Sequence, residues 1–260
     1  MIKALFTAAT GMEAQQTRIS VISNNLANMT TTGFKQSRAV FQDLLYQTVS
    51  EPGAETANGV TQPSPFQIGS GVRVVSTPAV FTQGVLEQTG RNLDIAIEGD
   101  GFLEVELPNG TGYTRSGALA VNQNGDLVTQ NGFLIQPGVG NLNGVTGLTI
   151  GVDGVVSGIP EGQSDITNLG QIQISTFSNP AGLKAIGRNL FMASEASGDA
   201  QAVNPGENNS GTLRQGFLEG SNVNVAEELI NMVMAQRAFE LNSKVIRTSD
   251  EILAATNQMR

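Results

Sequence analysis

An apolar residue returns at every seventh position at both ends of this chain, which is the repeat of a helix that packs lengthwise against another helix. The residues that we place on the seam of the first helix are Leu5, Met12, Ile19, Ile22 and Leu26. Those that we place on the seam of the last helix are Val225, Leu229, Met232, Phe239, Ile246 and Leu253. Each end holds only about three to four heptads and several intermediate positions are polar, so either helix alone would be marginally stable in water. We therefore expect the two helices to pair.

Charge is distributed unevenly along the chain, whose net charge is −9. Residues 1–45 hold four basic and two acidic side chains, a net of +2, and residues 215–260 hold four basic and six acidic ones, a net of −2. The middle of the chain therefore carries the whole net negative charge. The opposite charges of the two ends favour their pairing, and a negative surface disfavours nucleic acid as a partner.

Composition favours a folded structural protein over an enzyme. The 260 residues are 39% hydrophobic and 14% charged, which is enough apolar material for one large or two ordinary domains. Because the chain has no His and no Cys, it lacks the commonest metal ligands, thiol nucleophiles, disulfides and imidazole bases. We expect no catalytic residues, no metal and no cofactor.

The start of the chain predicts a helix and not a secretory signal peptide. Glu13, Gln15, Gln16 and Arg18 interrupt the first apolar stretch before a signal core could form. Since no run of 18 apolar residues occurs, we also expect no membrane insertion. The absence of Cys suits a protein that leaves the reducing cytosol, which would require export without a cleaved signal.

The middle of the chain reads as antiparallel β-structure. The first helix should end between Asn28 and Gly33, and the turn-rich stretch that follows it, residues 46–75, should form an extended loop or hairpin. Four hairpin turns are predicted at Asn109-Gly110, Asn124-Gly125, Asn131-Gly132 and Asp153-Gly154, within a meander of short strands. Helix returns near Gly220, with Asn224 as the expected N-cap and Glu227 completing a capping box.

These observations predict an α+β fold in three parts. A discontinuous coiled-coil domain combines residues 1–45 with 215–260, residues 46–75 form the connector, and residues 76–214 form a β-rich antiparallel outer domain.

Two clusters of acidic or amide side chains could be taken for chemical sites. Asp94, Glu98 and Asp100 lie within seven residues, but we expect the first two to face solvent and Asp100 to form a turn. Residues 122–126 resemble part of a calcium-binding loop, yet the flanking helices and the terminal Glu are missing, so a hairpin is favoured.

Two long motifs give the chain a family resemblance. Residues 23–35 (SNNLANMTTTGFK) resemble the N-terminal signature of the bacterial flagellar rod and hook axial proteins, and residues 220–244 (GSNVNVAEELINMVMAQRAFELNSK) resemble the C-terminal one. Motifs at residues 38–48, 93–102, 113–117 and 169–187 are most similar to those of the distal-rod branch. The resemblance thus covers nearly the whole chain.

The resemblance implies a structural subunit of the flagellar drive shaft, located in the basal body between the periplasm and the outer membrane. In that family the terminal helices form an inner tube around the export channel, the β domain forms the outer shell, and copies repeat as a helical homo-oligomer. The implied partners are proximal rod proteins, the hook protein, the peptidoglycan and outer-membrane ring proteins, the rod cap and the type III export apparatus.

Two further sets of residues follow from the resemblance. The signature turn after the first helix comprises Asn24, Asn25, Asn28, Gly33 and Phe34. The segment that would stiffen the rod contains Tyr46, Pro52, Pro63 and Pro65. Two alternatives stay open: a proximal rod or hook subunit of the same family, and a secreted β-rich glycan hydrolase, which would need two carboxylates facing a cleft.

Overall fold

The computed structural model describes residues 2–52, 55–56, 60–61, 64–162, 165–208 and 210–258. The chain forms two compact units. The first comprises Met1–Leu26, Ser37–Pro78 and Val225–Arg260, and the second comprises Ala27–Gln36 and Ala79–Asn224.

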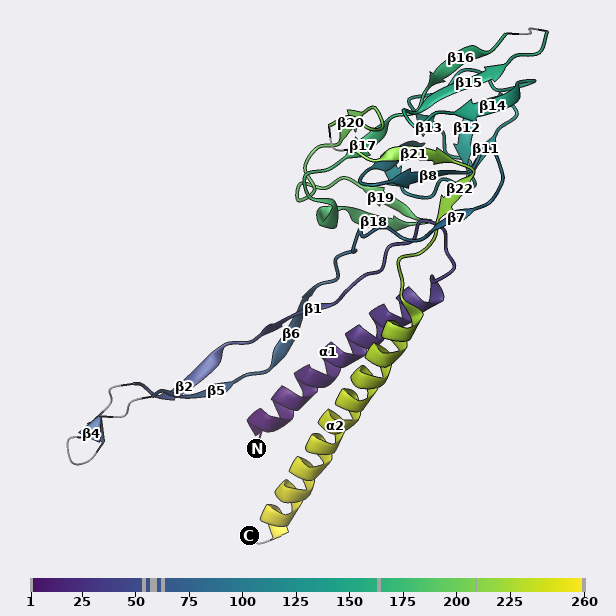
Figure 1. Cartoon of the computed structure of the whole chain (residues 1–260). Helices are drawn as coiled ribbons and strands as arrows, with labels where there is room; N and C mark the ends of the chain where they lie inside the picture. The colour runs from purple at the N-terminus through teal and green to yellow at the C-terminus, as the bar shows by residue number, and fades with distance from the viewer. Residues whose placement is uncertain are drawn as a thin grey trace. The chain divides into compact units, whose positions relative to one another are not determined.

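The first unit contains the two long helices, α1 (Ile2–Ala27) and α2 (Val225–Gln258), which run side by side in Figure 1. Helix α1 ends directly before the Asn-Met-Thr-Thr-Thr-Gly stretch, as expected from its poor helix formers. Helix α2 starts directly after Asn224. None of the helices in the described part of the chain combines the length and the apolar character needed to cross a membrane.

A two-stranded antiparallel arm completes this unit. Its base pairs β1 (Val40–Asp43) with β6 (Val72–Ser76), and its next section pairs β2 (Tyr46–Ser50) with β5 (Phe66–Gly69). Further out, β3 (Glu55–Thr56) pairs with β4 (Val60–Thr61). The outer part of the arm points away from the two helices in Figure 1. Because these strands pair antiparallel, the connector predicted between residues 46 and 75 is a hairpin in the residues described.

The second unit consists of short antiparallel strands. A seven-stranded sheet has the order β18-β19-β10-β9-β17-β20, with β13 paired to β9. Its strands are β9 (Phe102–Leu107), β10 (Gly110–Thr114), β13 (Ile135–Gln136), β17 (Ile174–Thr176), β18 (Lys184–Gly187), β19 (Leu190–Met192) and β20 (Gln201–Val203). A three-stranded sheet contains β14 (Thr146–Ile150), β15 (Val155–Ile159) and β16 (Thr167–Gln171). Three strand pairs join β11 (Leu119–Val121) to β12 (Leu127–Thr129), β8 (Ile95–Glu98) to β21 (Thr212–Gln215), and β7 (Leu86–Gln88) to β22 (Phe217–Glu219). One 3-10 turn, η1, spans Pro180–Gly182.

Two apolar clusters form the core of the second unit. The larger one gathers aliphatic side chains from many strands, among them Ile95, Leu103 and Ile174. The smaller one is aromatic: Phe102 lies edge-to-face with Phe81 and Phe177 at ring-centroid distances of 5.2 and 5.7 Å. These edge-to-face contacts add to the stabilisation that burial of the rings already provides.

The structure confirms the α+β fold, with paired terminal helices around an antiparallel β-rich middle. All four predicted turns have their glycine at positive φ, for example Gly110 at 129° between β9 and β10. The simple meander is wrong, because β9 pairs with β17 and β10 pairs with β19 across long sequence separations. Turn residues encode only hairpins between consecutive strands, so they could not reveal these pairings.

Candidate assembly interface

Most residues on the predicted heptads are at least partly buried. On α1, Ile22 is buried, and the other predicted seam residues, Leu5, Met12, Ile19 and Leu26, are partly buried. On α2 the partly buried residues are Met232, Phe239, Ile246 and Leu253. Val225 and Leu229 lie instead at the surface, where 38% and 46% of their area is exposed. Within one copy, therefore, the first two turns of α2 leave apolar side chains uncovered.

Polar contacts fix the alignment of the two helices. The Arg18 guanidinium donates to the Asn231 side-chain oxygen at 3.2 Å, and the Asn25 amide donates to a Glu228 oxygen at 3.4 Å. Gly11 lies against Asn242, whose Nδ2 would be 2.8 Å from a β-carbon at that position. A larger residue at position 11 would therefore require the Asn242 side chain to shift.

Glu228 is the titratable group that the seam buries. Burial raises its pKa above the ordinary value for Glu, and neighbouring Glu227 raises it further, whereas the hydrogen bond from Asn25 and the charge of Arg18 oppose the shift. Its second carboxylate oxygen is buried without a hydrogen-bond partner. The ionised form is thus disfavoured in the paired helices.

The signature turn is held by side-chain to main-chain hydrogen bonds. Asn25, at the end of α1, donates to the Ser37 carbonyl and accepts from the Ser37 amide, both at 2.9 Å. Asn28 accepts from the Thr31 hydroxyl at 3.2 Å, while Asn24 lies exposed on the last turn of α1. Asn25 thereby fixes where the chain re-enters the first unit.

Gly33 is required by space as well as by conformation. Its φ is +70°, and a β-carbon there would approach the Ser116 amide nitrogen to 2.7 Å. Its amide donates to the Glu219 carbonyl at 2.7 Å, and the Phe34 carbonyl accepts from the Asn222 amide at 3.4 Å. The second half of the signature turn is therefore part of the second unit.

A buried ionic cluster lies beside this turn. The Lys35 ammonium contacts one Glu219 oxygen at 2.6 Å and donates to the Thr82 carbonyl at 2.7 Å. The Arg115 Nε lies 3.0 Å from the other Glu219 oxygen, close enough for an ion pair although its angle is poor for a hydrogen bond. The Gly84 amide donates to Glu219 at 2.9 Å. Burial lowers the pKa of Lys35 and the nearby Arg115 charge lowers it further, against the attraction of Glu219.

Asn222 extends the cluster to a third stretch of chain. Its side-chain amide donates to the carbonyls of Val80 and Thr82 at 2.8 and 3.1 Å, and its oxygen accepts from the Gln36 amide at 2.8 Å. We call Lys35, Arg115, Glu219 and Asn222 the clasp. It links the segments near residues 35, 81 and 220 within the second unit.

The clasp was not predictable from local sequence patterns. Lys35 and Glu219 are 184 positions apart, and no spacing rule connects them. One indication of these residues was present in the sequence. Lys35 and Arg115 lie inside motifs that carry the family resemblance, and Glu219 directly precedes such a motif.

The arm exposes the residues predicted to stiffen the rod. Tyr46 pairs with Gly69, and its ring lies 3.4 Å from the position of a Gly69 β-carbon. Pro52 and Pro65 are exposed, and Pro63 lies outside the described residues. The arm also exposes several large apolar side chains, namely Phe41, Leu45, Tyr46, Val49, Phe66, Ile68 and Val75.

The acidic cluster at residues 94–100 is structural. Asp94 was expected at the surface, but it is buried to 1% exposure and lies 3.5 Å from Arg91. The expectation was wrong because β8 is covered on both faces: Ile95, Ala96 and Ile97 are all buried, so alternation does not apply. Glu98 is half exposed beside Arg214, and the Asp100 carbonyl accepts from the Gly211 amide.

Neither acidic stretch forms a metal site. The Asn122 side chain accepts from the amides of Asn124 and Asp126, which closes the expected hairpin between β11 and β12. Within the described ranges, no three His, Cys, Asp or Glu side chains gather closely enough to hold a metal ion.

Three protein-family descriptions match this chain. Residues 5–35 match the family "Flagella basal body rod protein", residues 96–158 match "Flagellar hook protein FlgE/F/G D1 domain", and residues 214–259 match "Flagellar basal body rod FlgEFG protein C-terminal". The first and third matches contain the two terminal motifs.

Curated relatives match the chain from end to end. It is 48% identical over 260 residues to the flagellar basal-body rod protein FlgG of Buchnera aphidicola from Acyrthosiphon pisum, and 46% identical over 261 residues to that of Caulobacter vibrioides, with all of both chains covered in each case. The protein of the same name from Bacillus subtilis is 41% identical over 263 residues, covering 97% of each chain.

Proposed function

Because this chain belongs to the family of flagellar basal-body rod proteins, we propose that it is a non-enzymatic structural subunit of the distal rod. Copies would assemble into a rigid helical tube that encloses the export channel and transmits torque from the motor to the hook. The full-length similarity carries this proposal, and the paired helices and projecting arm are features that a tube subunit needs.

We propose a separate structural role for each of the three predicted parts of the chain. Residues 1–45 with 215–260 form the coiled-coil inner tube, residues 46–75 bridge subunits, and residues 76–214 form the outer shell. The support is that α2 leaves apolar side chains uncovered within one copy, so the helices have surface left for neighbours. A contact that repeats without closing produces such a tube.

The arm is the element that we assign to stiffening. Its strands are paired in register yet expose apolar side chains such as Tyr46, Val49 and Phe66, which would be unfavourable for a hairpin in water. Those side chains would be covered by neighbouring subunits, so that the arm locks adjacent copies together.

As a rod protein, the chain assembles with other components of the basal body. We propose as specific partners the proximal rod proteins, the hook protein, the ring proteins of the peptidoglycan and outer membrane, the rod cap and the type III export apparatus. The negative charge of the middle of the chain would limit adhesion to the rings that surround the rod.

Electron microscopy of hook–basal bodies tests the function. In cells that lack their own distal rod protein, this chain should restore straight rods and motility, and antibody labelling should decorate the rod. Labelling of the proximal rod or of a flexible hook would support the alternative within the family. Turnover of purified peptidoglycan would support the glycan-hydrolase alternative.

A further inference from the structure

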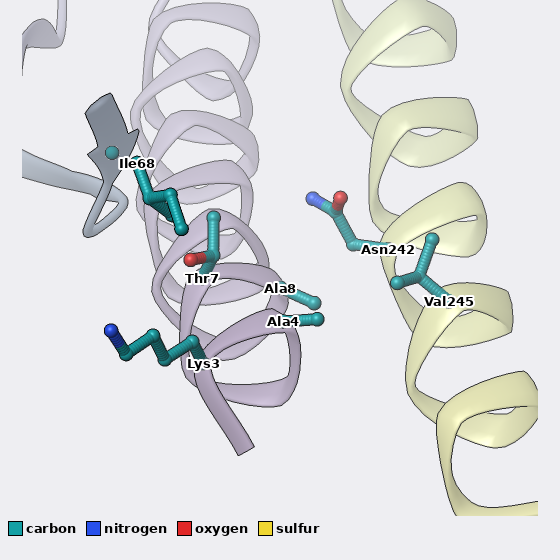
Figure 2. Close-up of a pocket in the computed structure, with 8 residues that line it drawn as sticks. Lys3, Ala4, Thr7, Ala8, Ile68, Asn242 and Val245 are labelled. Atoms are coloured by element: carbon teal, nitrogen blue, oxygen red, sulfur yellow. The ribbon is translucent and has the colours of Figure 1, made fainter. Parts of the chain in front are cut away.

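Helix α1 meets two different elements of its own copy on two of its faces. Figure 2 shows Ala8 directed toward α2, whereas Thr7 lies beside Ile68 of the arm. A hollow of about 580 Å³ lies between the three elements. The Lys3 ammonium donates to the Gln47 side-chain oxygen of the arm. The face of α1 that meets the arm is thus distinct from the face that meets α2.

The arm runs along α1 past two smaller hollows. One has a volume of about 250 Å³ and is lined by Phe6 of α1 and by residues 68–70 of the arm, among others. The other has a volume of about 260 Å³ and is lined by Glu13 of α1 and by residues 72–74 of the arm, among others. Gly71 lies between these two stretches of the arm, so the backbone there can approach α1 without a side chain in between.

Thr10 and Gly71 form a close contact at this point. The φ of Gly71 is +117°, and a β-carbon there would overlap the Thr10 Oγ1 and lie 3.3 Å from the Thr10 Cβ. The Thr10 hydroxyl donates to the Thr7 carbonyl at 2.9 Å within the helix, and it accepts from the Val72 amide of the arm at 3.4 Å. The contact therefore uses both the hydroxyl of Thr10 and the missing side chain of Gly71. We call this pair of residues the latch.

We propose that the latch positions the arm: it seats the base of the arm on α1 of the same copy and thereby sets the direction of the arm. The proposal deepens the proposed function, because it names the contact that orients the element assigned to bridging subunits. Tyr46, Val49 and Phe66 stay more than half exposed in the seated arm, so they remain available to neighbouring copies.

Seating of the arm depends on the helical state of α1. Lys3, Thr10 and Thr17 bond to the arm or border it at intervals of seven residues. Residues at this spacing share a face only while the segment is helical. An unfolded α1 would therefore release the arm, and folding of α1 would orient it.

Crosslinking of the purified full chain tests the proposal. Because the chain has no Cys, the substitutions Lys3→Cys and Gln47→Cys supply a single pair of thiols for a short bis-maleimide. We expect a crosslink within one copy, which mass spectrometry recognises by the mass of a single chain plus the linker. Crosslinks only between copies, or no crosslink, would overturn the proposal.

Substitutions at the latch, made in this two-cysteine chain, show whether it seats the arm. Gly71→Ala should lower the crosslink yield about 10-fold, because it adds a steric overlap and a strained backbone. Gly69→Ala is the matched control in the same arm, since its β-carbon would meet Tyr46 of the arm itself, at 3.4 Å, and it should leave the yield unchanged.

A second substitution separates the latch from strain within the arm. Thr10→Ala removes the oxygen that a β-carbon at position 71 would overlap, so the double variant should crosslink better than Gly71→Ala alone. A double variant that crosslinks no better would assign the loss to strain within the arm and overturn the role of the latch.

The dependence on α1 has its own variant. Ala9→Pro interrupts α1 at an exposed position and should abolish the crosslink. An unchanged yield would overturn the dependence of seating on the helix. If the unsubstituted chain restores no rods while the two-cysteine chain crosslinks within one copy, the proposed function fails and the latch stands.

Discussion

Replacing Glu219 by Gln should destabilise the second unit strongly, because this one carboxylate balances two buried cations. The Glu219 side chain is completely buried, and Lys35 and Arg115 contact its two oxygens at 2.6 and 3.0 Å. The Gln side chain has the same shape but no charge. Both cations would then remain in the interior without a counter-ion, although Lys35 keeps its hydrogen bond to the Thr82 carbonyl.

The expected loss is about 3–5 kcal/mol of unfolding free energy, which is the typical effect of removing one partner from a buried ion pair. The second unit spans Ala27–Gln36 and Ala79–Asn224, which is 10 plus 146 residues. For a body of this size, about 1 kcal/mol shifts the melting temperature by roughly 2–4 °C. The melting temperature should therefore fall by roughly 6–20 °C.

Calorimetry of the full chain, supported by urea unfolding, measures this loss. Glu98→Gln is the matched control, since Glu98 contacts Arg214 at 3.6 Å with both side chains about half exposed, and its effect should stay below about 1 kcal/mol. The Glu219→Gln penalty should also shrink at alkaline pH. Burial and Arg115 already lower the pKa of Lys35, and without Glu219 the ammonium group loses its proton to form the neutral amine at a lower pH. Equal effects of the two substitutions would refute this account of the clasp.

Three further predictions concern the first unit. Deleting residues 51–65 should leave a tube that assembles but bends in electron micrographs, because the pairs from Tyr46–Gly69 to Thr48–Gln67 can remain while the residues between them form the new turn. Straight rods would show that stiffness comes from the helices instead. Phe239→Asp should place an unpaired charge in the predicted seam, so rods and motility should be lost while calorimetry shows an unchanged second unit. Rods of normal strength would show that Phe239 does not face the seam. Glu228→Gln should stabilise helix pairing at neutral pH. Since the pKa of Glu228 is raised on pairing, wild-type pairing weakens as pH rises through that pKa, and circular dichroism from about pH 4 to 8 should show this loss only in the wild type.

The parts of the fold that local sequence determines were predictable. Heptad spacing identified both helices, and Asn-Gly and Asp-Gly pairs located hairpins because their glycine accepts positive φ. Such rules involve residues close in sequence, where few conformations compete. The order of the seven-stranded sheet depends on packing among distant strands and has no comparable local code.

The candidate interface was predictable only in part for the same reason. The heptad pattern named Phe239 and Ile246, which are partly buried, but it could not distinguish them from a side chain such as Leu229 that stays exposed in a single copy. Both kinds are apolar at helical spacing. The pattern also could not show the pocket lined by Ala4, Ile68 and Val245, because that pocket depends on how the arm and the two helices pack together.

The clasp suggests a mechanical role for the signature turn, which is to distribute load among the chain segments that join the two units. In the proposed rod, torque between the helices and the β-rich unit would cross the chain near residues 27, 37, 78 and 225, where the two units exchange segments. Within the second unit, Asn222 and Glu219 bond the stretches that lead to these crossings, at Gln36, Val80 and Gly84. A load applied to one crossing would therefore be shared by the others through short hydrogen bonds and ion pairs. Single strands without such links would each stretch separately, which would be unsuitable for a drive shaft.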